Sequence, residues 1–519
     1  MGLPIRFPSV MLFNSYLFLF VFLPLVLVGF FLLGKRVGSS AAMAWLLMAS
    51  VVFYASWEPA YLVLLFASLA FNYSAARFIE KADRGRKAVL LSAVSANVLL
   101  LFYYKVAIAG LFDVDVHTSA AFSTKEDVLI PLAISFITFQ QIAFLVDTYR
   151  RRVRMARVLE YSLFIVFFPQ LVMGPIVHYR ELIPQFRLPE FSHWRWDNVT
   201  IGLSIFIIGL FKKVVLADGI APYVNEVYEA LYLQKEISSL DAWGGALGFQ
   251  MQIYFDFSGY ADMAVGLARM LNINLPINFD SPYRATSRFD FWRRWHISFG
   301  AFMRQYVFFP LARSRRIRIG RLGALVATTM ISGIWHGVGV TFVVWGALQG
   351  LLMALIHYRG VLLGSLGWKW NARLFNPWLP MLMTFCVTML LGVFFRSRDL
   401  DVAISMLAQM YDGIVLLVGG HFHAFVYDMK MMSRYDAILI ALMMVVVWGM
   451  PSTQRFFRDC WSALDQRPRA PKDTPPDLLP GVSGLGFQIN RKWAVVVGLL
   501  LFIAIVFMDQ TSRFIYFQF

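Results

Sequence analysis

Two histidines stand where this sequence could carry out proton transfer. His336 lies in an apolar, glycine-bearing run within the triplet Trp335-His336-Gly337, and His296 follows a pair of arginines. An unperturbed imidazole titrates at about pH 6.5, so it can accept a proton from a hydroxyl near neutral pH. The alternative is a histidine that only hydrogen-bonds to a neighbouring helix, as lone histidines in apolar helices often do.

Two carboxylates form a second group, in the otherwise apolar segment 254–263. On a helix, Asp256 and Tyr260 would share one face, and so would Ser258 and Asp262, because residues four apart are neighbours. Ionisable groups inside apolar helices are costly, so each is a functional candidate. The competing interpretation is a polar seam of mutually hydrogen-bonded groups between helices, since buried polar groups need partners.

A third group lies between residues 278 and 298. Tryptophans beside arginines are typical of a helix in the headgroup layer of a membrane. That interpretation explains the aromatic and basic residues. It accounts less well for His296, which begins an apolar stretch. Together with Asp256, Tyr260, Asp262, Trp335 and Gly337, the candidates for lining or supporting a substrate channel are Asn278, Asp280, Trp292, Arg293, Arg294 and Trp295.

Hydrophobic helices must hold these groups in place. The 519 residues are 59% hydrophobic and 15% charged, whereas about a quarter of the residues of soluble domains are charged. Apolar runs long enough for a hydrocarbon core of ~30 Å recur along the chain, and helices satisfy all backbone groups within one segment. We therefore predict an all-α integral membrane protein with roughly 11–13 transmembrane or re-entrant helices, at 12–33, 43–57, 61–78, 89–112, 128–146, 158–177, 199–216, 243–271, 322–335, 338–357, 378–395, 435–448 and 493–508.

One of these segments has breaking signals. Pro169, Gly174 and Pro175 could turn the segment 158–177 into a hairpin that never crosses the bilayer. No sequence repeat or separate soluble domain is evident, so we expect a single polytopic membrane domain over residues 1–519. Within it, residues 451–492 form a proline-rich, basic loop.

The formal net charge of +16 does not indicate a nucleic-acid binder, because the basic residues form short clusters between apolar runs. Lys35-Arg36, the run 77–87 and the run 150–157 occur at alternate turns and are predicted to be cytoplasmic, which places the N-terminus outside. The second strong cluster, Arg313 to Arg321, and the loop 451–492 are predicted to be cytoplasmic as well.

Metal and disulfide chemistry have little support. The two cysteines, Cys386 and Cys460, lie in or beside apolar sequence and form neither a disulfide framework nor a CxxC motif. His421 and His423 are two apart with no acidic ligand beside them, a weak metal signal. We expect no metal and no tightly bound cofactor.

The three polar segments, taken together, resemble the core of the membrane-bound O-acyltransferase (MBOAT) family, in particular its bacterial branch that serves alginate O-acetylation and teichoic acid D-alanylation. Similar stretches include Met11 to Pro24, Phe53-Tyr54-Ala55, the run 254–266, the run 289–298, the Trp-His-Gly triplet and Val344-Trp345-Gly346-Ala347. They occur in family order over residues 11–395, which delimits an MBOAT-like core.

The resemblance implies that His336 is the catalytic histidine and that His296 is a second functional histidine. It also implies a funnel of tilted helices around a central site, in the inner membrane of a bacterium. The acyl group, most simply acetyl from a cytoplasmic thioester such as acetyl-CoA, would pass to a hydroxyl reached from the other face. A periplasmic or extracellular acyltransferase partner would then modify a polysaccharide such as alginate or another cell-surface polymer.

The sequence departs from the alginate branch in one region. Residues 309–316 replace the Gly-Gly-Asn turn usual there, and Gly300 and Met303 fall where that branch favours a hydroxyl residue and a leucine. The polymer and the partner are therefore open. Transfer of D-alanine or a longer acyl chain, a flippase for a lipid-linked sugar, and a purely structural subunit remain alternatives.

Overall fold

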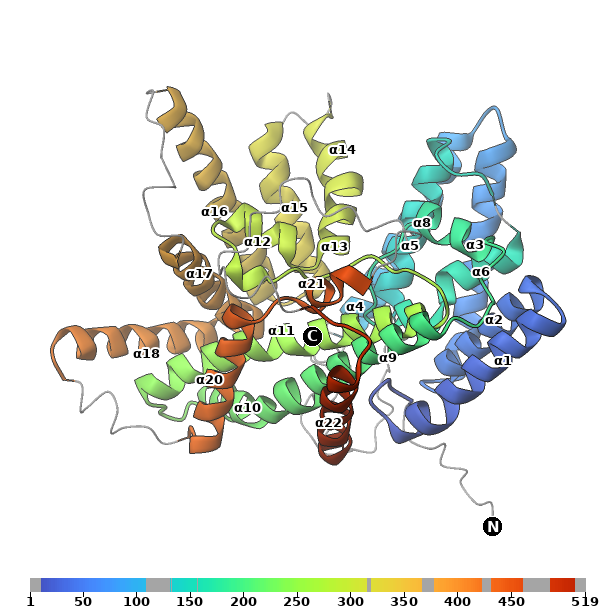
Figure 1. The fold of residues 1–519 in the computed structure, drawn as a ribbon. Helices are drawn as coiled ribbons and strands as arrows, with labels where there is room; N and C mark the ends of the chain where they lie inside the picture. Colours follow the sequence, from blue (N-terminus) through green and yellow to red (C-terminus); the bar gives the residue numbers. More distant parts are fainter. Residues whose placement is uncertain are drawn as a thin grey trace, which may run out of the picture. The chain divides into compact units, whose positions relative to one another are not determined.

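The computed structural model describes residues 11–108, 131, 133–155, 157–314, 319–365, 378–421, 431–460 and 486–508. These residues form helices and the turns between them, with no strand (Figure 1). The predicted all-α membrane fold is confirmed. Most of the basic loop 451–492 and the histidine His423 lie outside the described residues.

The internal contacts divide the chain into two compact units. That the chain is a single polytopic membrane domain stays a prediction. The first unit takes residues 1–210, 260–277 and 489–508. Its helices are η1 (Phe18–Phe22), α1 (Leu23–Arg36), α2 (Ser39–Ala55), α3 (Tyr61–Lys81), α4 (Arg86–Ile108), α5 (Ile134–Tyr149), α6 (Val158–Val166), α7 (Phe168–Leu171), α8 (Tyr179–Phe186), α9 (Trp196–Phe211), the end of α11 (Ser239–Met270), and α22 (Arg491–Phe507).

The second unit takes residues 211–259, 278–488 and 509–519. Its described helices are η2 (Lys212–Ala217), α10 (Asp218–Tyr232), most of α11, η3 (Pro282–Arg284), α12 (Arg288–Arg294), α13 (Ile297–Phe302), η4 (Met303–Phe308), α14 (Phe309–Ala312), α15 (Gly320–His336), α16 (Val340–Ser365), α17 (Trp378–Arg396), α18 (Leu400–Val418), α20 (Arg434–Gly449), α21 (Thr453–Phe456) and η6 (Arg458–Cys460).

Seven helices in the described part of the chain are long and apolar enough to cross a bilayer, which makes the protein a multi-pass membrane protein. They are Phe18–Arg36, Tyr61–Lys81, Arg86–Val106, Trp196–Tyr232, Val340–Arg359, Trp378–Arg396 and Leu400–Val418. The last of these was not among the predicted segments. Its Asp399 accepts the backbone N–H of Val402 at 2.8 Å and so caps the start of α18.

Several other predicted segments form helices of 17 residues or fewer: α2, α5, α15, α20 and α22. The segment 158–177 breaks as its prolines indicated. Helix α6 ends at Val166, Phe167 leaves the helical region with φ −51° and ψ 107°, and Pro169 stands in the first turn of the four-residue α7. The chain has no helix from Val172 to His178.

Candidate active site

His296 is held in an uncommon backbone conformation between α12 and α13. Its φ of 44° and ψ of 56° are left-handed, which costs a residue with a Cβ on the order of 1–2 kcal/mol. Asn278 stabilises this turn from a separate segment: its carbonyl oxygen accepts the N–H of Ile297 at 3.0 Å, and its Oδ1 accepts the Ser298 hydroxyl at 2.6 Å. The predicted supporting residue Asn278 therefore fixes the direction of the histidine.

The imidazole of His296 is buried, with 2% of the residue exposed. Phe257 of α11 meets it edge-on at 4.7 Å between ring centroids, and Phe299 of α13 stacks on it at 4.9 Å. Neither ring nitrogen has a hydrogen-bond partner among the described residues. Burial lowers the pKa of His296, which lies outside the seven candidate spans, to about 3. At neutral pH the ring is uncharged and offers one N–H donor and one acceptor.

His336 reaches the same aromatic cluster from the end of α15. Its residue is 6% exposed, and its ring lies 5.9 Å from that of Phe299, 5.5 Å from Trp345 and 5.0 Å from Phe395. The two histidines, 40 positions apart in the sequence, thus share Phe299 as a neighbour. The structure brings together the two residues that the sequence proposed for catalysis.

Close packing of α15 on α16 sets the position of His336. A Cβ at Gly346 would lie 2.5 Å from the carbonyl oxygen of Thr329, and one at Gly333 would overlap the carbonyl group of Phe342. Gly337 ends α15 in extended backbone, where a Cβ would overlap the Phe342 ring. The glycines around the histidine therefore allow the two helices to approach, as small residues do in membrane bundles. Figure 1 shows α15 and α16 beside each other.

The predicted tryptophans and arginines of the site differ in burial and contacts. Trp335 stacks on Phe299 at 4.5 Å, and Trp292 meets Trp345 at 6.0 Å, so both indoles belong to the cluster around His336. Trp295 stacks on Phe291 at 5.6 Å. In contrast, Arg293 is exposed, which fits the headgroup interpretation of this side chain.

Arg294 and Asp280 form ion pairs that hold the backbone of this region in place. Arg294 is buried and its Nε donates to Asp290 at 3.0 Å. Asp280 receives the N–H groups of Arg455 at 2.7 Å and 3.1 Å, one on each carboxylate oxygen. Because this forked pairing is geometrically specific, it ties the segment that carries Asn278 to α21.

Asp256 belongs to a buried ion triad. The Lys213 ammonium lies 2.7 Å from a carboxylate oxygen of Asp256 and 2.7 Å from one of Asp218, and all three side chains are at most 2% exposed. Lys213 lies in the π-helical turn η2, a geometry often found at functional sites. Asp256 precedes Phe257, the residue that packs on His296, so the triad fixes the part of α11 next to the histidine.

Tyr260 and Asp262 lie in the first unit. The Tyr260 hydroxyl lies 3.4 Å from Oδ1 of Asn14, and its ring lies 6.1 Å from Phe13. Both residues are buried, Asp262 at 2% exposure. For Tyr260 these contacts, with a turn before η1, favour a packing role over a place in the channel.

Sequence reasoning missed the residues that connect the site. Phe299 and Phe395 are ordinary phenylalanines in apolar runs, so their type gives no signal. Lys213 could have been found, because a lysine inside the apolar segment 199–216 is as unusual as the aspartates are. Arg455, far along the chain from its partner Asp280, carries no sequence signal of that pairing.

Comparison with known proteins identifies the family of this chain. Residues 88–362, which include both histidines, match the sequence model of the MBOAT, membrane-bound O-acyltransferase, family. The chain is 37% identical over 433 residues to the peptidoglycan O-acetyltransferase of Helicobacter pylori, covering 77% of this chain and 80% of that protein. It is 32% identical over 521 residues to the probable alginate O-acetylase AlgI of Pseudomonas putida, covering 98% of this chain and 100% of that protein.

A third relative is more distant. The teichoic acid D-alanyltransferase of Bacillus subtilis is 27% identical over 261 residues, which cover 48% of this chain and 62% of that protein.

Proposed function

Because the chain belongs to the membrane-bound O-acyltransferase family and is an acyltransferase, we propose that it moves an acetyl group from a cytoplasmic thioester, such as acetyl-CoA, toward O-acetylation of a cell-surface polysaccharide. The observation that carries this proposal is the pair of buried histidines, both in contact with Phe299. One of them, His296, has two ring nitrogens without a partner in the described structure.

In the proposed reaction His336 is the general base. Its ring nitrogen takes the proton of the acceptor hydroxyl while the hydroxyl oxygen forms a bond to the carbonyl carbon of the thioester. The resulting tetrahedral intermediate carries a negative oxygen, to which the N–H of neutral His296 donates. The carbon–sulfur bond then breaks, and the thiolate receives the proton from the His336 imidazolium. The products are an ester and a free thiol, and no oxidant or metal is needed.

Acetyl is favoured over D-alanyl as the transferred group. The relatives named for O-acetylation are 31–37% identical and align with 77–98% of this chain, whereas the D-alanyltransferases are 25–27% identical over 42–48% of it. Peptidoglycan and alginate are the polymers in the relatives' names. The final acceptor that we propose is thus a sugar hydroxyl of such a polymer.

The proposal includes a place and a partner. We place the chain in the bacterial inner membrane, with the thioester on the side of the basic clusters and the acceptor on the other. A periplasmic or extracellular acyltransferase would receive the acetyl group and bring the polysaccharide. Support comes from the alternation of basic turns in the sequence and from relatives named for peptidoglycan and alginate.

The test is transfer of labelled acetyl from acetyl-CoA to water or a model sugar by purified protein. His336→Ala should lower turnover at least a hundredfold, since general base catalysis contributes roughly 10²–10⁴-fold. His357→Ala is the matched control, because His357 is an exposed histidine on α16. Polymer acetylation in cells, with expression verified, should follow the same order. Unchanged transfer by the His336→Ala protein would remove this histidine from the mechanism.

A further inference from the structure

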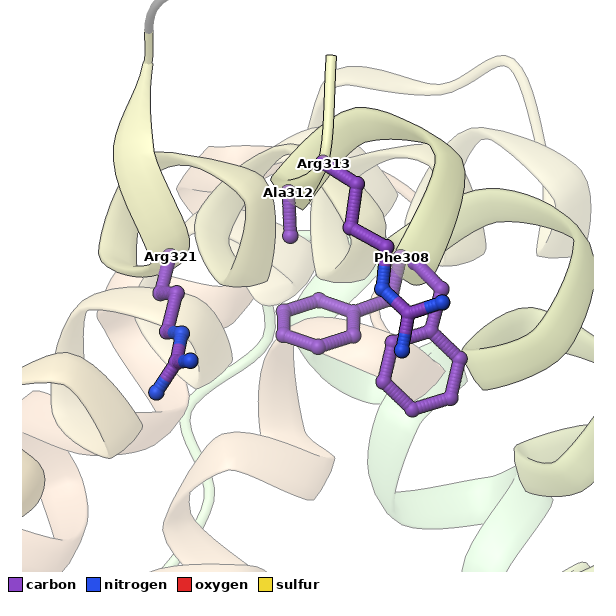
Figure 2. A pocket seen from close by; sticks show the side chains of 5 residues that line it. Phe308, Ala312, Arg313 and Arg321 are labelled. Atoms are coloured by element: carbon purple, nitrogen blue, oxygen red, sulfur yellow. The ribbon is translucent and has the colours of Figure 1, made fainter.

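A pocket of about 450 Å³ lies where η4, α14 and α15 meet. It is lined by Phe308, Phe309, Ala312, Arg313 and Arg321. Figure 2 shows the Arg321 side chain on one side of the pocket and the Arg313 and Phe308 side chains on the other. The pocket therefore combines two guanidinium groups with two aromatic rings, a lining suited to an anion attached to an apolar or planar group.

No described residue compensates the positive charge of this pocket by an ion pair. Neither guanidinium makes an ion pair or hydrogen bond with a described residue, and the Arg313 guanidinium lies over the Phe309 ring at 4.8 Å. The sequence contains no aspartate or glutamate from Phe291 to Arg398. Two arginines without a carboxylate partner can each donate a fork of hydrogen bonds to a phosphate group.

Helix α15 connects this pocket to the histidine cluster. Arg321 is the second residue of α15 and His336 is its last, so a rise of 1.5 Å per residue places their backbones about 22 Å apart. A donor of the coenzyme A type has its phosphates and its thioester at opposite ends of a pantetheine arm of comparable length. Arg321 and His336 thus lie at opposite ends of one helix, at a separation comparable to the length of such a donor.

We propose that the Arg313–Arg321 pocket binds the phosphate groups of a coenzyme A-type acyl thioester. The arginines contact the phosphates, and the rings of Phe308 and Phe309 contact the apolar arm or the base. This inference rests on the proposed acyltransferase function. It concerns the stretch 309–316, where the sequence departs from the alginate branch, and so assigns a role to residues of this chain in particular.

A phospholipid headgroup offers the same phosphate chemistry, and arginines beside aromatic rings also occur at membrane surfaces. The two sources differ in what they do to the kinetics. A donor subsite affects the KM for donors that carry phosphate and leaves donors without phosphate unaffected. A lipid site changes activity with the lipid composition and does not distinguish between donors.

The experiment uses the full-length protein in nanodiscs of phosphatidylcholine, with or without phosphatidylglycerol. Acetyl transfer is measured with acetyl-CoA and with acetyl-pantetheine, which lacks phosphate. Arg313→Gln and Arg321→Gln should each raise the KM for acetyl-CoA about tenfold, which corresponds to about 1.4 kcal/mol, with kcat retained. The KM for acetyl-pantetheine should stay unchanged. Arg304→Gln, an exposed arginine of η4 outside the pocket, is the control.

Binding of free coenzyme A gives a readout that does not depend on catalysis. The protein with His336→Ala should bind coenzyme A normally, and the double variant R313Q/R321Q should bind it at least tenfold more weakly. If the unaltered protein binds coenzyme A but transfers no acetyl group, the proposed function fails and the subsite stands. The inference is wrong if both arginine variants keep their affinity for coenzyme A and their KM for acetyl-CoA. It is also wrong if the variants lose activity equally with acetyl-CoA and acetyl-pantetheine, and only when phosphatidylglycerol is present.

Discussion

At the scale of single residues, the two histidines differ in what the sequence could say about them. Both were found from their types and neighbours, because an imidazole in apolar sequence is rare and chemically capable. The left-handed backbone of His296 could not be predicted, since histidine is enriched at positive φ but adopts it in only a minority of cases. It follows from Asn278, which closes the turn from another segment.

Two variants of His296 can separate its role as a hydrogen-bond donor from a role in proton transfer. His296→Gln retains an N–H donor and should keep turnover within about tenfold of the unaltered protein, whereas His296→Ala should lose 10²-fold or more, the usual effect of removing one oxyanion donor. Acetyl transfer by the two purified variants gives the comparison. Equal loss in both would point to proton transfer or to a packing role, and thermal unfolding would separate these.

At the scale of elements, apolar runs predicted most helices but not their partners. The segment 158–177 broke where its prolines indicated, and 199–216 proved to be part of a longer continuous helical stretch, Trp196–Tyr232. Leu400–Val418 was missed, because Asp401 and Asp412 interrupt its apolar run. Which helices lie together depends on side-chain volume at contact points, such as the glycines between α15 and α16, and a single sequence does not reveal those pairs.

The glycine contacts give a prediction about α15 and α16. Gly346→Ala would place a methyl group 2.5 Å from the Thr329 carbonyl oxygen, and overpacking of this kind costs about 1–3 kcal/mol. We expect a lower unfolding temperature in detergent and weaker acetyl transfer, since His336 depends on this contact. Gly498→Ala in α22 is the control, because a Cβ there meets nothing within 4 Å. Equal behaviour of the two variants would contradict the packing argument.

At the scale of the molecule, residues far apart in the chain are joined by buried charge. The sequence singled out the aspartates of α11, but it left open whether they take part in catalysis or only stabilise the packing of helices. Asp256 now has a structural partner in Lys213, which also holds Asp218. Asp280, likewise flagged, has Arg455. Asp256 and Asp280 thus support the unit that holds the histidines, and the catalytic proposal remains with His336 and His296.

Lys213→Met tests that structural role. It leaves two carboxylates buried without their cation, and breaking a buried ion pair costs about 3–5 kcal/mol. We expect a large fall in the unfolding temperature, with partial recovery in the triple variant K213M/D218N/D256N, which removes the uncompensated charges. Lys212→Met changes the adjacent lysine, which is only partly buried, and should have a small effect. Stability unchanged by Lys213→Met would show that the triad is not needed for folding.

Helix α15 ends at His336 and begins beside Arg321. An inserted residue between them would move the imidazole by about 1.5 Å along the axis but turn it by about 100° around it. The rotation of residues around the helix axis therefore constrains α15 more strictly than the length of the helix does. Related chains with a longer or shorter α15 can keep both ends in use only by changing it in whole turns, or by absorbing the difference in a bulge.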